Sequence, residues 1–495
     1  MLFTYKNNKV EIPYEFATKP YKHQEQVVAD TALEPYWAYF LEMGCGKSKI
    51  MLDKISLLAQ IKKIKAAVIL APKGVYSNWV NKEIPQHFSK TIPYITIKWG
   101  EKKKAFKNLW EEITSSSYKP TSFIFFIMNI EALSSKSGII ALTAFLNKYA
   151  PECLICCDES TVIKNPKASR TVAAVKAAQK CHYRAILTGS PITKSPLDLY
   201  AQCAFLKQGI LGHSSFYTFR NEYAILKEQI NPYNGAMFKQ VVGYQNEDKL
   251  KKILTGFSTR ITKQECLDLP EKIYTIREVE MTSEQKALYD AIKKENLALF
   301  ENGDQISTQF AITRLLRMHQ IICGCTKTDS GEEISIKNNR LSELMDILNE
   351  VSGKAIIWAN YRRNIKDIEE AIRKEYGPRV IVSYYGDTST ADREIAVKRM
   401  QEDDECRFFV GNTQTGGYGI TLTAANTTIY YSNNYDLEKR LQSEDRNHRI
   451  GQTENVHYID LVTPGTVDLK ILKALKNKIN IATAILGDEA KEWLL

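Results

Sequence analysis

An apolar run passes directly into a glycine-rich turn at residues 36–49, which read YWAYFLEMGCGKSK. Gly44 and Gly46 allow the backbone to curl so that its N–H groups face a phosphate, and the helix expected after them points its N-terminus toward the same anion. In such a loop Lys47 reaches the β and γ phosphates of a nucleotide, and the Ser48 hydroxyl holds Mg²⁺. The longer form of this pattern has one more glycine at its start, which this chain lacks. A glycine-rich turn before a basic helix is therefore the alternative.

A second apolar run ends in two adjacent carboxylates at residues 155–160, ICCDES. In a parallel sheet the carboxyl end of a strand faces the ligand crevice. Asp158 is thus placed to bind Mg²⁺, directly or through water, and Glu159 to orient and deprotonate an attacking water. The alternative is a solvated acidic turn, which the phosphate loop upstream makes the weaker explanation.

Short apolar runs rich in branched residues alternate with helical stretches, a pattern typical of an α/β protein with parallel sheets. Residues 200–339 differ, because they are rich in Lys, Glu and Gln and carry apolar residues at helical spacing. We therefore expect two parallel-sheet lobes with a mostly helical segment inserted between them. The expected strands are 66–70, 123–128, 154–157 and 185–187 before this segment, and 355–358, 380–384, 408–410, 428–431 and 457–461 after it.

The composition is that of an ordinary globular protein, with 44% hydrophobic and 25% charged residues in a chain of 495. The net charge of +10 suits a polyanionic partner such as nucleic acid, although many proteins carry as much charge. No apolar run approaches the roughly 18 residues needed to cross a bilayer, and residues 1–21 contain no secretion signal. A cytoplasmic location is expected.

The ten cysteines do not form a zinc pattern. Cys153, Cys156 and Cys157 lie in an apolar run, Cys323 and Cys325 form a separate pair, and no second ligand cluster stands at a suitable spacing. We expect these residues to be small buried hydrophobic side chains in a reducing compartment.

Further segments carry the motifs of one family. They are residues 19–24 (KPYKHQ), 71–79 (APKGVYSNW), 158–165 (DESTVIKN), 187–192 (LTGSPI), 268–272 (DLPEK), 281–289 (MTSEQKALY), 315–321 (LLRMHQI), 413–422 (TQTGGYGITL) and, most specifically, 442–452 (QSEDRNHRIGQ). From about Pro20 to Ile481 the chain resembles the Swi/Snf-type DNA-dependent ATPases of helicase superfamily two, in particular a compact bacterial or phage member. It departs from them at 324–325, where they have His-Pro, and at 431–435, where they commonly have an acidic residue and Trp-Asn-Pro. The second departure leaves the lobe–lobe contact in that region open.

The resemblance implies two RecA-like lobes. Residues 1–200 would form the ATP-binding lobe, 201–339 a helical insertion, 340–480 a second lobe with arginine fingers, and 481–495 a C-terminal helix or tail. Arg446 and Arg449 are three residues apart and so would share one face of a helix, although a solvated basic face is the alternative.

The resemblance also assigns roles to individual residues. Arg446 and Arg449 would stabilise the charge that develops during hydrolysis, and Gln24 would bond the adenine base, while Gly44, Gly46 and Gln442 would complete the nucleotide site. Thr188, Gly189 and Ser190 would couple hydrolysis to lobe movement. The expected DNA-contact residues are Lys73, Ser77, Asn129, Thr413, Gly416 and Gly417.

The function implied is hydrolysis of ATP, with Mg²⁺, that drives translocation on double-stranded DNA and remodels protein–DNA complexes or branched DNA. A strand-separating DNA or RNA helicase would use the same lobes. A catalytically inactive DNA-binding scaffold is the remaining alternative, and the complete set of ATP-site side chains argues against it.

Overall fold

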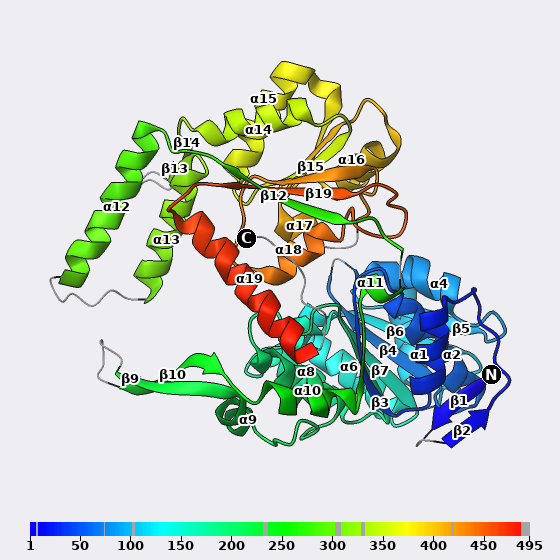
Figure 1. The fold of residues 1–495 in the computed structure, drawn as a ribbon. Coiled ribbons are helices and arrows are strands. Elements are labelled where there is room, and N and C mark those ends of the chain that lie inside the picture. Colours follow the sequence, from blue (N-terminus) through cyan, green and yellow to red (C-terminus); the bar gives the residue numbers. More distant parts are fainter. Residues whose placement is uncertain are drawn as a thin grey trace. The chain divides into compact units, whose positions relative to one another are not determined.

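The computed structural model describes residues 1–5, 8–73, 75–100, 104–115, 117–230, 236–266, 268–301, 308–327, 332–416 and 420–486 (Figure 1). The chain divides into two compact units. The first comprises the described parts of 1–227, 241–268 and 481–489, and the second those of 228–240, 269–480 and 490–495. No described helix has the length and apolarity to span a membrane.

A sheet of seven described parallel strands forms the centre of the first unit. In spatial order they are β11 (Ser258–Ile261), β3 (Tyr36–Leu41), β8 (Tyr183–Leu187), β7 (Cys153–Asp158), β4 (Ala66–Ala71), β6 (Phe123–Asn129) and β5 (Tyr94–Lys98). All six residues of β4 are buried, as expected for a central strand covered on both faces, where an uninterrupted apolar run replaces alternation. The carboxyl ends of these strands share one edge of the sheet.

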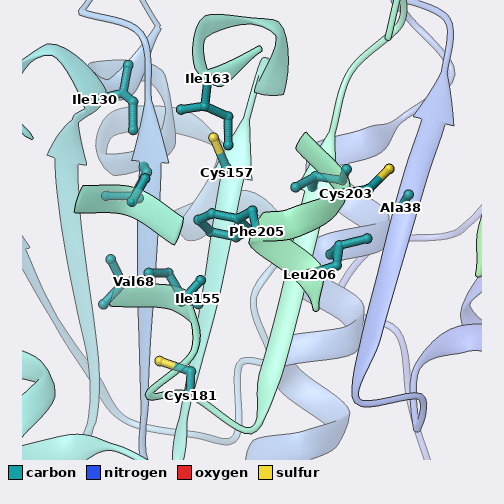
Figure 2. Close-up of a cluster of buried hydrophobic side chains, with 14 of the residues drawn as sticks. Ala38, Val68, Ile130, Ile155, Cys157, Ile163, Cys181, Cys203, Phe205 and Leu206 are labelled. Carbon is teal, nitrogen blue, oxygen red and sulfur yellow. The ribbon is translucent and has the colours of Figure 1, made fainter. Parts of the chain in front are cut away.

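Helices cover both faces of this sheet and give it two hydrophobic cores. Figure 2 shows α8 lying over one face, where Phe205 and Leu206 pack with Val68, Ile155 and Cys157 of the sheet. The expectation that the cysteines are buried hydrophobic side chains is confirmed for Cys153, Cys156 and Cys157. The helices of this unit are α1 (Lys22–Thr31), α2 (Lys47–Gln60), α3 (Tyr76–Asn78), α4 (Ile84–His87), α5 (Lys104–Thr114), α6 (Lys136–Tyr149), α7 (Ser169–Ala178), α8 (Leu199–Leu206), α9 (Phe216–Tyr223), α10 (Glu247–Thr255) and α11 (Lys263–Cys266).

The second unit contains six parallel strands among its described residues. Their order is β12 (Lys272–Glu278), β19 (Val456–Val462), β18 (Ala425–Tyr430), β15 (Lys354–Trp358), β17 (Phe408–Gly411) and β16 (Ile381–Tyr384). Its helices are α12 (Ser283–Glu301), α13 (Thr308–Ile322), α14 (Asn339–Glu350), α15 (Arg362–Tyr376), α16 (Thr390–Glu402), α17 (Thr413–Gly416) and α18 (Leu437–Glu444), together with α19 (Val467–Leu486) as far as residue 480. The expectation of two parallel-sheet α/β lobes is confirmed.

The middle segment contains helices α9 to α13, as expected, and also strands that the sequence did not predict. It supplies β11 to the first sheet, β12 to the second, and the antiparallel strands β9 (Ala224–Ile230), β10 (Met237–Tyr244), β13 (Cys325–Lys327) and β14 (Glu333–Ser335). Strands β11 and β12 lie at sheet edges and are only half-buried, so they lack the apolar runs that mark the central strands. A further hairpin, β1 (Leu2–Tyr5) and β2 (Asn8–Glu11), lies at the N-terminus.

The unit boundaries also fall elsewhere than the positions 200, 339 and 480 proposed from the sequence. Residues 201–339 are divided between the two units, and position 480 lies inside α19. The final stretch, 487–495, is outside the described residues.

Candidate active site

The phosphate loop connects β3 to α2. Gly44 and Gly46 have φ values of +89° and +84°, which residues with a Cβ adopt only at a cost, and Gly46 is the N-cap residue immediately before α2. The ammonium of Lys47 lies inside the loop and donates to the carbonyls of Leu41 (2.9 Å) and Glu42 (3.4 Å). Ser48 follows in the first turn of the helix, half-buried. The structure thus forms the predicted loop with its lysine turned inward.

Gln24 lies directly against this loop. A Cβ built on Gly46 would stand 2.2 Å from the Gln24 side-chain nitrogen, which is itself 3.5 Å from the carbonyl of Cys45. The Gln24 amide oxygen accepts a hydrogen bond from the backbone N–H of Tyr21. In this structure Gln24 therefore supports the loop, and its contact with adenine stays a prediction.

The acidic strand end lies two strands away at the same sheet edge. Asp158, the last residue of β7, accepts hydrogen bonds from the Trp79 indole (2.9 Å) and from the backbone N–H of Glu159 (3.0 Å). Burial raises the pKa of Asp158, while the Trp79 hydrogen bond and the charge of Lys47 act in the opposite direction. A buried carboxylate acted on by the Lys47 charge is the electrostatic arrangement expected of a nucleotide site.

The backbone of Glu159 is held in a costly conformation. Its φ of 48° and ψ of 59° place it in the left-handed region, where a residue with a Cβ is disfavoured by about 1–2 kcal/mol. Such strain persists where the surrounding structure enforces it, and it concentrates at functional positions. The left-handed backbone, which the sequence alone did not reveal, supports the role predicted for Glu159.

The donors at this site fit Mg²⁺, the metal expected from the sequence. Mg²⁺ prefers hard oxygen ligands, and Asp158 offers a buried carboxylate while Ser48 offers a hydroxyl in the first turn of α2. Their role as metal ligands stays a prediction.

The predicted coupling loop lies against the phosphate loop. The Thr188 N–H donates to the Tyr39 carbonyl of β3, and the Ser190 N–H donates to the Thr188 hydroxyl (3.2 Å). At Gly189 a Cβ would come within 3.3–3.4 Å of Leu41 and Glu42, so this glycine permits a close approach of two backbones.

Two further side chains join these loops, and the sequence analysis did not identify either. Gln202 of α8 accepts from the Ser160 hydroxyl (2.7 Å) and donates to the Pro191 carbonyl (2.8 Å), which ties the acidic turn to the coupling loop. Arg260 of β11 donates to the carbonyls of Phe40 and Gly189, each at 3.0 Å. Gln202 could have been identified from the sequence, because a glutamine within the apolar run of α8 is unusual. Arg260 could not, because it stands in a short, partly polar strand without a recognisable pattern.

The two predicted arginine fingers lie in the second unit, in a turn rather than on a helix. Helix α18 ends at Glu444, and beyond it the Arg446 N–H bonds the Ser443 carbonyl, three residues back, while the Arg446 carbonyl accepts from the Leu422 N–H. Both guanidinium groups nevertheless donate to the carbonyl of Ile420, Arg446 at 3.2 Å and Arg449 at 3.4 Å. The expectation of a shared helix face is wrong, but the two side chains do converge.

Gln442, predicted to contact nucleotide, is buried beside this turn. Its side chain donates to Glu438 (3.2 Å) and accepts from Lys439 (3.3 Å), and its carbonyl accepts from Arg446. Its position fits support of the arginine turn, and a nucleotide contact stays a prediction.

Three predicted DNA-contact residues lie near the carboxyl ends of β4 and β6. The side chain of Asn129 and the backbone N–H of Lys73 both donate to the Glu131 carboxylate, at 3.3 and 3.4 Å, and Ser77 lies in α3 nearby. The structure therefore brings Lys73 and Asn129 together. The sequence analysis did not anticipate Glu131, whose negative charge would oppose a phosphate at this place.

The other predicted DNA contacts belong to the second unit. Thr413 begins α17, and its buried hydroxyl has no hydrogen-bond partner among the described residues. The N–H of Gly416 donates to Asn412, and a Cβ there would lie 2.6 Å from the Trp358 ring, so packing explains this glycine. Gly417 lies outside the described residues.

Comparison with known families decides the identity of the fold. The sequence profile of the SNF2-related domain matches residues 40–327, more than half of the chain, and that of the helicase conserved C-terminal domain matches residues 336–451. The chain belongs to the SNF2-related family. This is the family that the sequence motifs indicated.

Relatives of the SNF2-related protein are diverse and longer. It is 23% identical over 462 residues to Protein CHROMATIN REMODELING 4 of Arabidopsis thaliana, covering 88% of this chain and 20% of the relative. It is 24% identical over 464 residues to the putative ATP-dependent helicase/translocase YwqA of Bacillus subtilis, covering 92% and 46% respectively. A solved structure, the SWI2/SNF2 ATPase core of Sulfolobus solfataricus in complex with dsDNA, is similar with 24% identity, 96% coverage of both chains and a TM-score of 0.43. The chain thus spans between a fifth and somewhat under half of the two curated relatives.

Proposed function

We propose that this SNF2-related protein couples ATP hydrolysis to translocation along double-stranded DNA, remodelling protein–DNA complexes or branched DNA. The observation that carries the proposal is the pair of complementary half-sites. The first unit holds Lys47 where its charge acts on Asp158, and the second directs Arg446 and Arg449 at one carbonyl. The names of two relatives, a chromatin remodelling protein and a putative helicase/translocase, support the same class of activity.

The residues of the first unit would bind ATP and prepare the attacking water. Backbone N–H groups of the phosphate loop and the Lys47 ammonium would hold the β and γ phosphates, and Ser48 and Asp158 would hold Mg²⁺. Bound Mg²⁺ would supply neutralisation of phosphate charge. Glu159, fixed by its left-handed backbone, would orient the water and accept its proton.

The arginines of the second unit would complete the site only when the units close on ATP. An arginine directed at the developing phosphate charge contributes about 10³–10⁵ in rate. Hydrolysis would then require closure, and each closing and opening would move one unit along DNA relative to the other. The coupling loop would transmit the effect of hydrolysis outward from the phosphate loop. It consists of Thr188, Gly189 and Ser190.

DNA would be held through its phosphates, with little sequence preference. Lys73, Ser77 and Asn129 in the first unit and Thr413, Gly416 and Gly417 in the second are the proposed contacts. The Glu131 carboxylate between Lys73 and Asn129 would have to turn away when a phosphate binds.

Phosphate release tests the proposal directly. We expect duplex DNA to stimulate hydrolysis more than single-stranded DNA or RNA, and the stimulation to fall steeply with salt as bound counterions are released. Lys47→Ala, Glu159→Gln and Arg449→Ala should each abolish turnover. Hydrolysis that is indifferent to every nucleic acid would contradict the proposal.

A strand-separating helicase is the second candidate, favoured by the match to the helicase C-terminal domain. A forked substrate distinguishes the two activities. Duplex translocation predicts ATP consumption without release of the labelled strand, and strand release would favour the helicase.

A further inference from the structure

The chain changes unit at several points, and one of them, residues 268–269, lies within the short stretch that joins β11 to β12. We call residues 262–271 the crossing segment; residue 267 lies outside the described part. Each of the two strands that it joins lies at the edge of its sheet. Both ends of the segment make specific contacts, and in each unit those contacts involve a catalytic loop.

The first end is anchored on the phosphate loop. Arg260, two residues before the segment, bonds the Phe40 and Gly189 carbonyls and the Glu42 carboxylate (3.3 Å). The other oxygen of Glu42 accepts from the backbone N–H of Lys263 (3.0 Å). Arg260 therefore joins the entrance of the phosphate loop, the coupling loop and the crossing segment.

A second contact lies farther along the same end. The sulfur of Cys266 is 3.4 Å from that of Cys45, which stands between the two glycines of the phosphate loop. The segment thus touches the loop at both Glu42 and Cys45. A shift of the phosphate loop would act on it at two points.

The second end is anchored on the arginine turn. The carbonyl of Pro270 lies 2.9 Å from His448 Nε2, inside the turn that carries Arg446 and Arg449. Lys272 donates to Glu444 (2.9 Å), the last residue of α18 and the start of the same turn. The anchor is therefore made to the turn that carries the two arginines.

Glu444 is itself rigidly held. Its buried carboxylate also accepts from Tyr274 (2.8 Å) and Arg440 (2.9 Å), and Arg440 in turn binds Asp460 and lies 3.5 Å over the Tyr430 ring. A buried charge with this many partners has few alternative positions. A displacement of the segment would be transmitted to the turn rather than absorbed by local rearrangement.

Only three residues separate Cys266 from Pro270, so the chain between the anchors has little slack. We propose that the crossing segment couples the two half-sites, with Arg260 and Glu444 as positioning residues at its ends. It passes the nucleotide state of the phosphate loop to the arginine turn. The inference rests on the proposed function, because it assumes that both half-sites serve one reaction.

The test adds slack while keeping every contacting side chain. Four glycines inserted between Asp268 and Leu269 should leave nucleotide affinity within about twofold of the parent while lowering DNA-stimulated kcat at least tenfold. The matched control inserts four glycines into the connection between α12 and α13, inside the second unit, and should hydrolyse ATP like the parent. A glycine-insertion variant at 268–269 with parental kcat would overturn the coupling role.

Arg260→Gln gives an independent answer if the insertion variant does not fold. Coupling predicts a lower kcat with an unchanged KM for ATP. A raised KM with unchanged kcat would mean that Arg260 only shapes the nucleotide pocket, and would overturn the proposal. A parent enzyme that DNA does not stimulate would refute the proposed function instead, so the two failures are distinguishable.

Discussion

Single residues of the phosphate loop are constrained in two different ways. Gly44 and Gly46 both have positive φ, but only Gly46 also faces a neighbour, since a Cβ there would meet Gln24 at 2.2 Å whereas one at Gly44 meets nothing within 4 Å. The backbone cost of alanine, about 1–2 kcal/mol, is common to both positions. The added cost at Gly46 therefore reports the Gln24 contact.

We expect Gly46→Ala to lower the thermal unfolding midpoint and ATP turnover more than Gly44→Ala does. Combining Gly46→Ala with Gln24→Ala should remove the excess loss of stability, because the steric partner is then gone. Differential scanning calorimetry of these three variants and the parent measures this. An equal loss of stability in the two glycine variants would show that the contact with Gln24 is irrelevant.

Glu159 offers a test that separates function from folding. Glycine accepts the left-handed backbone without strain, so Glu159→Gly should raise stability by about 1 kcal/mol while abolishing hydrolysis. Glu159→Gln should abolish hydrolysis without stabilising the fold, because the strained backbone is kept. Thermal unfolding and phosphate release decide the matter, and a destabilised Glu159→Gly would mean that the carboxylate itself stabilises the turn.

At the scale of elements, a buried cluster joins α13 to the start of α19. His319 lies 2.7 Å from the Tyr361 hydroxyl and 3.5 Å from Asp468, which also pairs with Arg340. Burial by itself would lower the pKa of His319, but Cys323 and Asp468 raise it to about 10. The folded state thus holds a proton that an unfolded histidine, with a pKa of about 6.5, releases at neutral pH.

Because the pKa of His319 is higher in the folded state, its protonation stabilises the folded protein fully at pH values below the unfolded-state pKa. This stabilisation is lost as the pH rises through the folded-state pKa. The difference in melting temperature between the parent and His319→Gln should therefore be largest near pH 6 and shrink toward pH 10. His457→Gln, at an exposed position of β19, is the control. A difference that does not change with pH would show that His319 stabilises by packing alone.

At the scale of the whole molecule, one chain carries both half-sites. If the two half-sites of one chain act on the same nucleotide, a mixture of Lys47→Ala and Arg449→Ala proteins should hydrolyse no more ATP than either protein alone. Neither protein in the mixture then contains a complete site. Steady-state phosphate release of the mixture checks this over a range of protein concentrations. Turnover restored by mixing would show that the arginines act on the nucleotide of a second copy.

The sequence by itself determined the central strands, the phosphate loop and the acidic strand end. Apolar runs, paired glycines and adjacent carboxylates are local patterns, each dictated by burial or by backbone curvature within a few residues. The motif at 442–452 likewise located the arginines without any structure. These features needed no knowledge of distant contacts.

Only the tertiary structure decided how these pieces are supported. Arg260, Gln202 and Glu131 act through partners far away in sequence, and β11 and β12 are half-buried edge strands whose position depends on the sheets they join. The left-handed backbone of Glu159 and the end of α18 at Glu444 were likewise set by surrounding contacts. Burial and backbone curvature require particular residue types at regular local spacings, so they can be predicted from the sequence. A hydrogen bond between distant segments imposes no such spacing, so it cannot.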